Sequence, residues 1–264
     1  MSIPKDIINF NPGLGDWSIL SAYRGSISHG MYIPENDPNS IDDKDVMSVC
    51  IPPVGYYFGL HQGGWVFPEN GTKEIKQNEW DIVIYEARKF IKLLAQGNPN
   101  VLCMLWVEEN YLLNITEEGR LLRDNRDLFV GRHVYKSFVG YAYGQLHRMT
   151  HINKKGYEGD KRRKLVEKFG YDTKNAAHLI RLLRMGIEFL KDGELSVMRP
   201  DASQLLEIKK GEWLLSKVIE ESDRLFIVAG QAYINSYLPK LPDYEQINKL
   251  SVKIISSFLD RCGT

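Results

Sequence analysis

Three aspartates crowd into positions 42–45 of this 264-residue sequence. Aspartates this close repel one another and add no packing to a strand, so a positive charge is expected among them. Asp43 and Asp45 are two apart, so in a strand both would project from one face, about 6 to 7 Å apart at the α-carbons. That spacing suits carboxylates that share one or two divalent cations. Asp42 would face the other way, so we take Asp43 and Asp45 as the pair.

A third carboxylate is expected, because phosphoryl-transfer sites use several acidic groups around their metal ions. Two ions together stabilise the entering and leaving oxygens of an in-line displacement. Asp81 is the first candidate, because it is the polar member of an otherwise apolar alternation. Glu86 is the alternative if that strand ends earlier, and the sequence leaves this choice open.

Gly25 and Ser26 complement the aspartates, because they follow an apolar run and precede the acidic cluster. A strand that ends in Gly-Ser leaves backbone N–H groups and a hydroxyl pointing outward, and these can hold the phosphates of a nucleotide. His29 is a further candidate contact to a phosphate or a base. The ordinary alternatives are a plain turn for Gly-Ser and an incidental loop position for the histidine.

Short strands are predicted to position these residues, from two apolar runs bounded by glycine or proline and a third run that alternates between two faces. The runs are residues 17–23, 45–52 and 79–86. In the last of them Asp81 shares a face with Val83 and Tyr85, and the run either remains a strand or passes into a helix. The glycine-rich segment 53–77 is predicted to be a hairpin insertion outside the core.

Helical periodicity begins at Glu86 and stops at the Gly97–Asn100 turn. Segment 101–107 fits a buried strand or a helix, because short apolar runs do not distinguish them. Apolar spacing of i, i+3, i+4 then predicts four helices, at residues 133–149, 175–193, 210–234 and 243–262. The predicted fold is α+β. A small mixed β-sheet core with flanking helices would occupy residues 1–110, and a helical region residues 111–264.

Composition excludes several classes of protein. The 34 basic and 34 acidic residues balance, so no overall field indicates nucleic acid or membrane. The cysteines Cys50, Cys103 and Cys262 are odd in number and widely spaced, which argues against a disulfide framework or a zinc site and indicates a reducing cytoplasm. Neither a signal peptide nor a membrane span is expected, because the sequence has no long apolar run.

The order of these features carries a family resemblance. A strand, Gly-Ser, Asp-x-Asp and then a third acidic residue on a neighbouring strand resemble the DNA polymerase beta-like nucleotidyltransferase superfamily. More narrowly, GSISHG, YEARKFIKLLAQGNPN and YAYGQLHRM resemble the predicted nucleotidyltransferases of the RNA repair pathway polymerase beta family. The resemblance covers most of residues 17–200 and is strongest over 18–100. The loop 27–42 is longer than in minimal members.

The resemblance implies a mixed sheet with flanking helices and two Mg²⁺ ions, with Mn²⁺ as an alternative. It also implies transfer of a nucleotidyl group from a nucleoside triphosphate such as ATP, with release of pyrophosphate. Lys89 and the Gly97–Asn100 turn recur in the resembling group, which implies that they approach the nucleotide. The alternative is a solvated helix residue and a helix stop.

A basic helix face follows later in the chain. His178, Arg181 and Arg184 lie at helical spacing, with Lys174 one turn earlier. Such a face can clamp a triphosphate or an acceptor phosphate, and Arg199 is similar. The ordinary alternative is the solvated side of an amphipathic helix.

The acceptor is open from sequence alone. Residues 148–168 hold eight Lys or Arg against three acidic residues, a run that suits an RNA backbone and hence an RNA 3′ end as acceptor. A small molecule or a protein side chain would need only a pocket. A different interpretation is a nucleotide-binding regulatory or antitoxin-like module with little turnover, which the complete acidic set disfavours. The nucleotide and the oligomeric state are also left open.

Overall fold

One mixed sheet organises the computed structural model, which describes residues 3–34, 37, 40, 42–59, 67–150 and 160–262. Its strands within this part of the chain are β1 (Ser18–Tyr23), β2 (Lys44–Cys50), β3 (Thr72–Gln77), β4 (Trp80–Glu86) and β5 (Leu112–Ile115). Their order is β3-β4-β2-β1-β5. Strands β2 and β4 are parallel and the other neighbouring strands antiparallel. The strands predicted at residues 17–23, 45–52 and 79–86 are confirmed as β1, β2 and β4.

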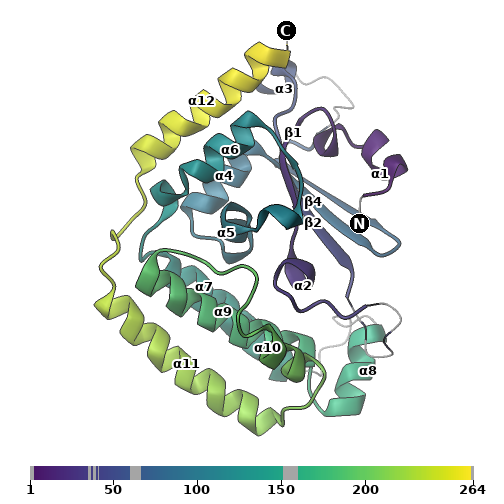
Figure 1. Ribbon diagram of the computed structural model, residues 1–264, viewed down its shortest axis with the longest axis vertical. Coiled ribbons are helices and arrows are strands. Elements are labelled where there is room, and N and C mark those ends of the chain that lie inside the picture. Colours follow the sequence, from purple (N-terminus) through teal and green to yellow (C-terminus); the bar gives the residue numbers. More distant parts are fainter. Residues whose placement is uncertain are drawn as a thin grey trace.

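Helices cover both faces of this sheet, and most of them lie on one side of it (Figure 1). Along the chain they are α1 (Lys5–Asn9), α2 (Gly25–Ser28), α3 (Val54–Phe58), α4 (Ala87–Ala95), α5 (Pro99–Trp106), α6 (Glu117–Asp124), α7 (Val134–Thr150), α8 (Asp160–Phe169), α9 (Thr173–Asp192), α10 (Ala202–Lys209), α11 (Leu215–Asn235) and α12 (Tyr244–Cys262). The predicted α+β architecture, with a mixed sheet, flanking helices and C-terminal helices, is confirmed.

The alternation of β2 and β4 divides the core in two. Met47 and Val83 belong to the large cluster that includes side chains of α4, α5, α7 and α9. Val46 and Ile82 belong to a smaller cluster with Ile7 and other residues of the N-terminal segment. Successive strand residues point to opposite faces, so Asp45 and Asp81 lie on the face that carries the large cluster.

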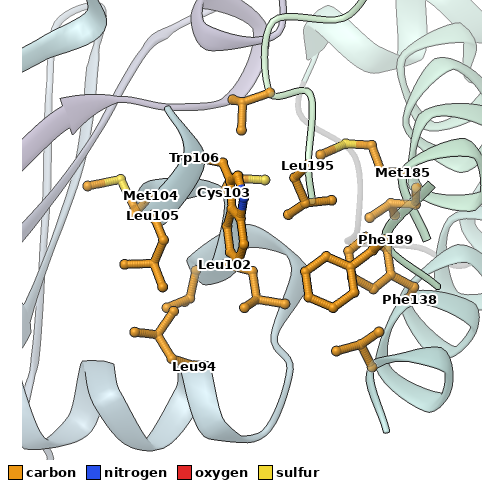
Figure 2. Close-up of a cluster of buried hydrophobic side chains, with 14 of the residues drawn as sticks. Leu94, Leu102, Cys103, Met104, Leu105, Trp106, Phe138, Met185, Phe189 and Leu195 are labelled. Atoms are coloured by element: carbon orange, nitrogen blue, oxygen red, sulfur yellow. The ribbon is translucent and has the colours of Figure 1, made fainter. Parts of the chain in front are cut away.

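Aromatic packing joins α5 to the long helices α7 and α9 (Figure 2). Trp106 of α5 meets Phe189 of α9 edge-on, with ring centroids 5.6 Å apart, and Phe138 of α7 stacks on Phe189 at 6.4 Å. Burial of such rings contributes much of the apolar stabilisation of a core. This contact holds α9 against the unit that carries the sheet.

The segment 53–77 differs from its prediction. It contains α3, and its last residues form β3, which pairs with β4 over the whole range from Thr72↔Tyr85 to Gln77↔Trp80. The end of this segment therefore contributes an edge strand of the sheet, where a hairpin insertion outside the core was expected. Residues 60–66 of the predicted insertion lie outside the described part.

Other boundaries also moved. Residues 101–107 are mostly helical, because Pro99 and the capping side chain of Asn98 begin α5 there. Strand β5 follows the boundary predicted near residue 110 and joins β1, and α12 returns to pack on α4, so one core spans that position. The helix predicted at 210–234 begins at Leu215, after Gly211 with φ of 78°. Helix α10 was not predicted. Among the described residues, no helix combines the length and apolarity that crossing a membrane requires.

Candidate active site

Asp45 and Asp81 are direct neighbours in the sheet. They are Cα partners in the parallel register of β2 and β4, near the start of each strand. Their side chains are 23% and 29% exposed, so both carboxylates are reachable from solvent. Asp43 lies just before β2 and is half-buried. The three aspartates predicted from sequence therefore gather at one end of the β2–β4 pair.

Gly25 lies directly against Asp45, which with its register partner Asp81 forms the acidic pair of the site. It begins α2 with φ of 62°, a conformation that favours glycine, and a Cβ placed on it would lie 2.5 Å from Oδ2 of Asp45. The amide of Arg24 donates to the carbonyl of Asp45 at 2.9 Å, which holds the two segments together. Ser26 is buried, and its Oγ has no hydrogen-bond partner within the described chain. Gly-Ser thus stands beside the aspartates, as the start of a short helix and not the end of a strand.

Arg24 lies between the two carboxylates. Its Nη2 is 3.6 Å from Oδ1 of Asp45 and 3.6 Å from Oδ1 of Asp81, and its Nε donates to the carbonyl of Val46 at 3.3 Å. Lys76 of β3 reaches Asp81 from the other side, with Nζ 3.7 Å from Oδ2. The positive charge expected among the aspartates is therefore present as side chains of the protein.

Burial shapes the electrostatics of this pair. It raises the pKa of Asp45 from 3.8 to about 6, and the negative charges of Asp81 and Asp43 act in the same direction. Arg24 and Lys174 oppose the rise but do not cancel it. The ionised carboxylate of Asp45 is therefore only partly compensated by these cations, which is the condition that a bound metal ion relieves.

Helix α9 brings Lys174, in its first turn, to the same end of the sheet. Lys174, 15% exposed, places Nζ 3.4 Å from Oδ1 of Asp42 and is close enough to lower the pKa of Asp45. His178 is half-buried one turn further on. Burial, followed by the charges of Arg181 and Lys174, holds the pKa of His178 well below its usual value. This imidazole is therefore neutral near pH 7.

The remaining predicted residues of this face have internal contacts. Arg181 is buried, and its Nη1 contacts Sδ of Met185 at 3.1 Å. Arg184 pairs with Asp201 at 2.7 Å and with Glu221 at 3.0 Å, which ties α9 to α10 and α11. Arg199 forms an ion pair with Glu188 at 2.6 Å.

His29 is a buried residue at the end of α2. Its Nδ1 donates to the carbonyl of Val197 at 2.8 Å, so it joins α2 to the loop after α9. Burial and the charge of Arg181 hold the pKa of His29 well below its usual value. The imidazole of His29 is therefore neutral near pH 7, and its Nδ1 is engaged in this hydrogen bond.

Lys89 and Glu86 lie at the opposite end of β4 from Asp81. Glu86 lies five positions after Asp81 in the strand, about 16 Å away at the usual rise. The buried carboxylate of Glu86 caps α4 by accepting from the amides of Arg88 and Lys89, at 3.0 and 3.2 Å. The parallel register places Cys50 beside Glu86 and Asp45 beside Asp81.

The basic run 148–168 is only partly described. Residues 151–159 lie outside the described part, and the rest contributes to α7 and α8. Arg162 pairs with Asp172, the residue that caps α9, at 2.9 Å. Arg163 and Lys164 are exposed on α8.

The roles of two residues at this site, Arg24 and Asp42, were not predicted from the sequence. Arg24 directly precedes Gly25, which was a usable signal for a counter-charge. Asp42 is fully buried, accepts from the amide of Ile33 at 2.9 Å and forms an ion pair with Lys209 of α10. Burial lowers the pKa of Lys209 to about 8 although Asp42 opposes it. No pattern connects two residues this far apart along the chain.

The donor set fits a magnesium ion. In the described ranges, no group of three or more His, Cys, Asp and Glu side chains is already arranged as a metal site. Mg²⁺ needs only one or two protein carboxylates, however, and completes its octahedron with water and phosphate oxygens. Asp45 and Asp81 supply adjacent carboxylates that already share a cationic group, the guanidinium of Arg24.

Comparison with known proteins identifies the family. No curated protein matches the chain. One similar solved structure is a nucleotidyltransferase-like protein from Exiguobacterium sibiricum 255-15, which is 9% identical with a TM-score of 0.29, and the match covers 97% of this chain and 73% of that one. The sequence matches the RNA repair pathway DNA polymerase beta family over residues 19–220, a range that contains the acidic pair, Gly25 and α9. The chain therefore belongs to the RNA repair pathway DNA polymerase beta family, a family of nucleotidyltransferases.

Proposed function

We propose that this protein is a Mg²⁺-dependent nucleotidyltransferase that moves a nucleotidyl group from a nucleoside triphosphate to an acceptor hydroxyl. One observation carries the proposal: Asp45 and Asp81 are register partners, and Gly25 lies against the carboxylate of Asp45. This is a compact set of acidic groups beside a turn suited to phosphates.

The reaction divides among these residues. The acceptor oxygen bonds to the α-phosphorus, the bond from that phosphorus to the bridging oxygen of the β-phosphate breaks, and pyrophosphate leaves. Asp43, Asp45 and Asp81 are the proposed ligands of two ions, and Asp81 also takes part in removing the acceptor proton. Bound Mg²⁺ supplies neutralisation of the charge on the phosphate oxygens.

The phosphates are assigned to the Gly25–Ser26 turn beside the aspartates. Gly25 allows close approach of backbone, Ser26 Oγ has no partner among the described residues, and Lys174 lies near Asp45, with His178 one helical turn further along α9. Lys89 has no part here, because it lies beyond the far end of β4. Arg184 is already satisfied by Asp201 and Glu221.

An RNA 3′ end is the proposed acceptor. Its support is the family to which the chain belongs and the exposed basic residues of α8, Arg163 and Lys164. Such residues bind a phosphate backbone through charge and lose affinity as salt rises.

Label transfer tests the proposal. Each α-labelled nucleoside triphosphate is incubated with Mg²⁺ and RNA, small-molecule or protein acceptors. Wild type is compared with Asp45→Asn, Asp81→Asn and the control Asp223→Asn, an exposed aspartate on α11. We expect transfer by wild type and the control, and a loss of about 100-fold or more in the two site variants. Transfer that survives both site substitutions would contradict the proposed site.

A further inference from the structure

Arg24 is held at the centre of the acidic pair by several contacts. Its guanidinium Nη2 is 3.6 Å from one oxygen of each aspartate, and Nε donates to the carbonyl of Val46 at 3.3 Å. The main chain of Arg24 is also fixed, since its amide donates to the carbonyl of Asp45 at 2.9 Å. The side chain is 26% exposed, so its charge is only partly screened by solvent.

A metal ion and this guanidinium need the same oxygens. Mg²⁺ binds carboxylate oxygens at about 2.1 Å, closer than the 3.6 Å contacts of Nη2. Two cations that shared both Oδ1 atoms would lie within a few ångströms of each other and repel strongly. The side chain must therefore move away from at least one aspartate before an ion can use both.

We propose that Arg24 is a built-in counter-cation, which neutralises Asp45 and Asp81 in the ion-free enzyme and must be displaced when a divalent ion binds them. This inference rests on the proposed function for the identity of the ion site. Its consequence is ordered loading: the free enzyme binds the ion weakly, and the ion binds well once a triphosphate offers the displaced guanidinium another anion.

The position of Arg24 supports that exchange. It directly precedes Gly25 and Ser26, which are the proposed phosphate contacts, so a displaced guanidinium remains next to the phosphates. Arginine pairs with phosphate oxygens at least as well as with carboxylates. A residue that only braced the strand would gain no new partner when nucleotide arrives.

Binding of Mn²⁺ to the nucleotide-free protein separates the two roles. Free Mn²⁺ is measured by electron paramagnetic resonance during titration of wild type, Arg24→Met and Arg24→Lys. We expect Arg24→Met to bind Mn²⁺ about tenfold more tightly than wild type, and Arg24→Lys to lie between them, because an ammonium does not bridge both carboxylates as a guanidinium does. With a non-hydrolysable triphosphate present, the advantage of Arg24→Met should shrink or reverse.

Lys76→Met is the matched control. Lys76 contacts Asp81 at 3.7 Å, but its side chain is 72% exposed, so removal of its charge should change Mn²⁺ affinity by less than about twofold. Equal or weaker Mn²⁺ binding by Arg24→Met would overturn the inference. If Arg24→Met does not fold, Arg24→Lys carries the test, and Mn²⁺ affinity no higher than that of wild type would overturn it in the same way.

Mn²⁺ binding by Asp45→Asn and Asp81→Asn shows whether a failure concerns the role of Arg24 or the proposed ion site itself. If both abolish Mn²⁺ binding while Arg24→Met binds like wild type, the ion site stands and only the role of Arg24 is wrong. If wild type binds no Mn²⁺ with or without triphosphate, and Arg24→Met binds none either, the proposed ion site fails and this inference fails with it.

Discussion

Asp42 and Lys209 form a buried ion pair although 167 residues separate them. The carboxylate of Asp42 is fully buried, and Nζ of Lys209 also donates to the carbonyl of Met31 at 2.8 Å. Lys174 approaches the same carboxylate from α9. This cluster connects the residue before the Asp43–Asp45 pair to α9 and α10, so it aligns the acidic end of the sheet with the helices that cover it.

We expect this pair to matter greatly for stability. Asp42→Asn leaves the buried ammonium of Lys209 without its carboxylate, which costs about 3 to 5 kcal/mol of unfolding free energy. Lys209→Met should cost less, because Lys174 still lies 3.4 Å from Asp42. Urea denaturation of each single variant and of the double variant measures this cost. The double variant should lose less than the sum of the two, because neither charge is then stranded.

The control for this prediction is Lys249→Met. Lys249 pairs with Glu245 on the surface of α12, where the side chains are 61% and 77% exposed, so the loss should be below about 1 kcal/mol. Equal losses of unfolding free energy in Lys209→Met and Lys249→Met would show that the buried pair stabilises the protein no more than a surface pair does.

The raised pKa of Asp45 predicts a pH-dependent stability. The folded-state value is about 6 against an ordinary 3.8, so the folded protein holds a proton that the unfolded chain releases between these values. The unfolding free energy therefore falls as pH rises from about 4 to 7, by about 3 kcal/mol from this group. Asp45→Asn removes this contribution.

Denaturation in the presence of a chelator measures the difference between wild type and Asp45→Asn. We expect the variant's stability relative to wild type to rise by about 3 kcal/mol between pH 4 and pH 8. Asp223→Asn, an exposed aspartate, serves as the control and should show almost no such trend. A relative stability of Asp45→Asn that stayed flat over this range would mean that burial does not penalise the ionised carboxylate.

Gly25→Ala tests the contact between the turn and the acidic pair. The new Cβ would lie 2.5 Å from Oδ2 of Asp45, so the carboxylate or the turn must move. We expect label transfer to fall by about tenfold or more, since a small misplacement at a reacting centre is costly.

Gly170→Ala is a close control, because Gly170 also has positive φ, at 81°, but a Cβ placed on it would meet nothing within 4 Å. It should cost about 1 kcal/mol of stability through backbone strain alone and leave label transfer unchanged. Similar transfer rates in both alanine variants would show that the close contact between Gly25 and Asp45 is not needed for label transfer.

Substitution of Asp81 and of Glu86 shows which of them is the third carboxylate, because the two variants should change different properties. Asp81→Asn should lower the transfer rate by about 100-fold or more with little effect on melting temperature. Glu86→Gln should do the reverse, because Glu86 caps α4, accepts from Tyr57 at 3.0 Å and pairs with Arg88. Its loss should cost about 1 kcal/mol or more, read from thermal unfolding. A large rate loss in Glu86→Gln with unchanged stability would favour that residue.

The proposed RNA acceptor predicts a salt effect on α8. Reversal of the exposed residues Arg163 and Lys164 to glutamate should weaken RNA binding and reduce the salt slope by about 0.7 for each lost phosphate contact. Arg162 is unsuitable for this test, because its pair with Asp172 supports the start of α9. The matched control reverses Lys191 and Lys253, which are exposed on α9 and α12. An unchanged slope in the α8 variant would leave RNA without support as acceptor.

Local rules explain which parts of the fold could be predicted. Period-two alternation identified the strands that carry Asp45 and Asp81, and period 3.6 identified α7, α9 and α12. Strand β3 was not predicted to join the sheet, because its sequence, TKEIKQ, is mostly polar and shows little alternation of hydrophobicity. Helix α10 was missed because it is short, with eight residues, and its N-cap residue Asp201 makes no side-chain capping hydrogen bond.

The acidic residues, Gly25 and Ser26 were recognisable in the amino-acid sequence because chemistry and backbone preference are local properties. Spacing of two places Asp43 and Asp45 on one face, and glycine suits a turn with positive φ. The partners of these residues depended on the three-dimensional fold. The parallel register sets Asp81, and not Glu86, beside Asp45, and the packing of α9 and α10 brings Lys174 and Lys209 to Asp42. Strand pairing and helix docking join residues far apart in the chain, and no short-range pattern encodes the distance between them.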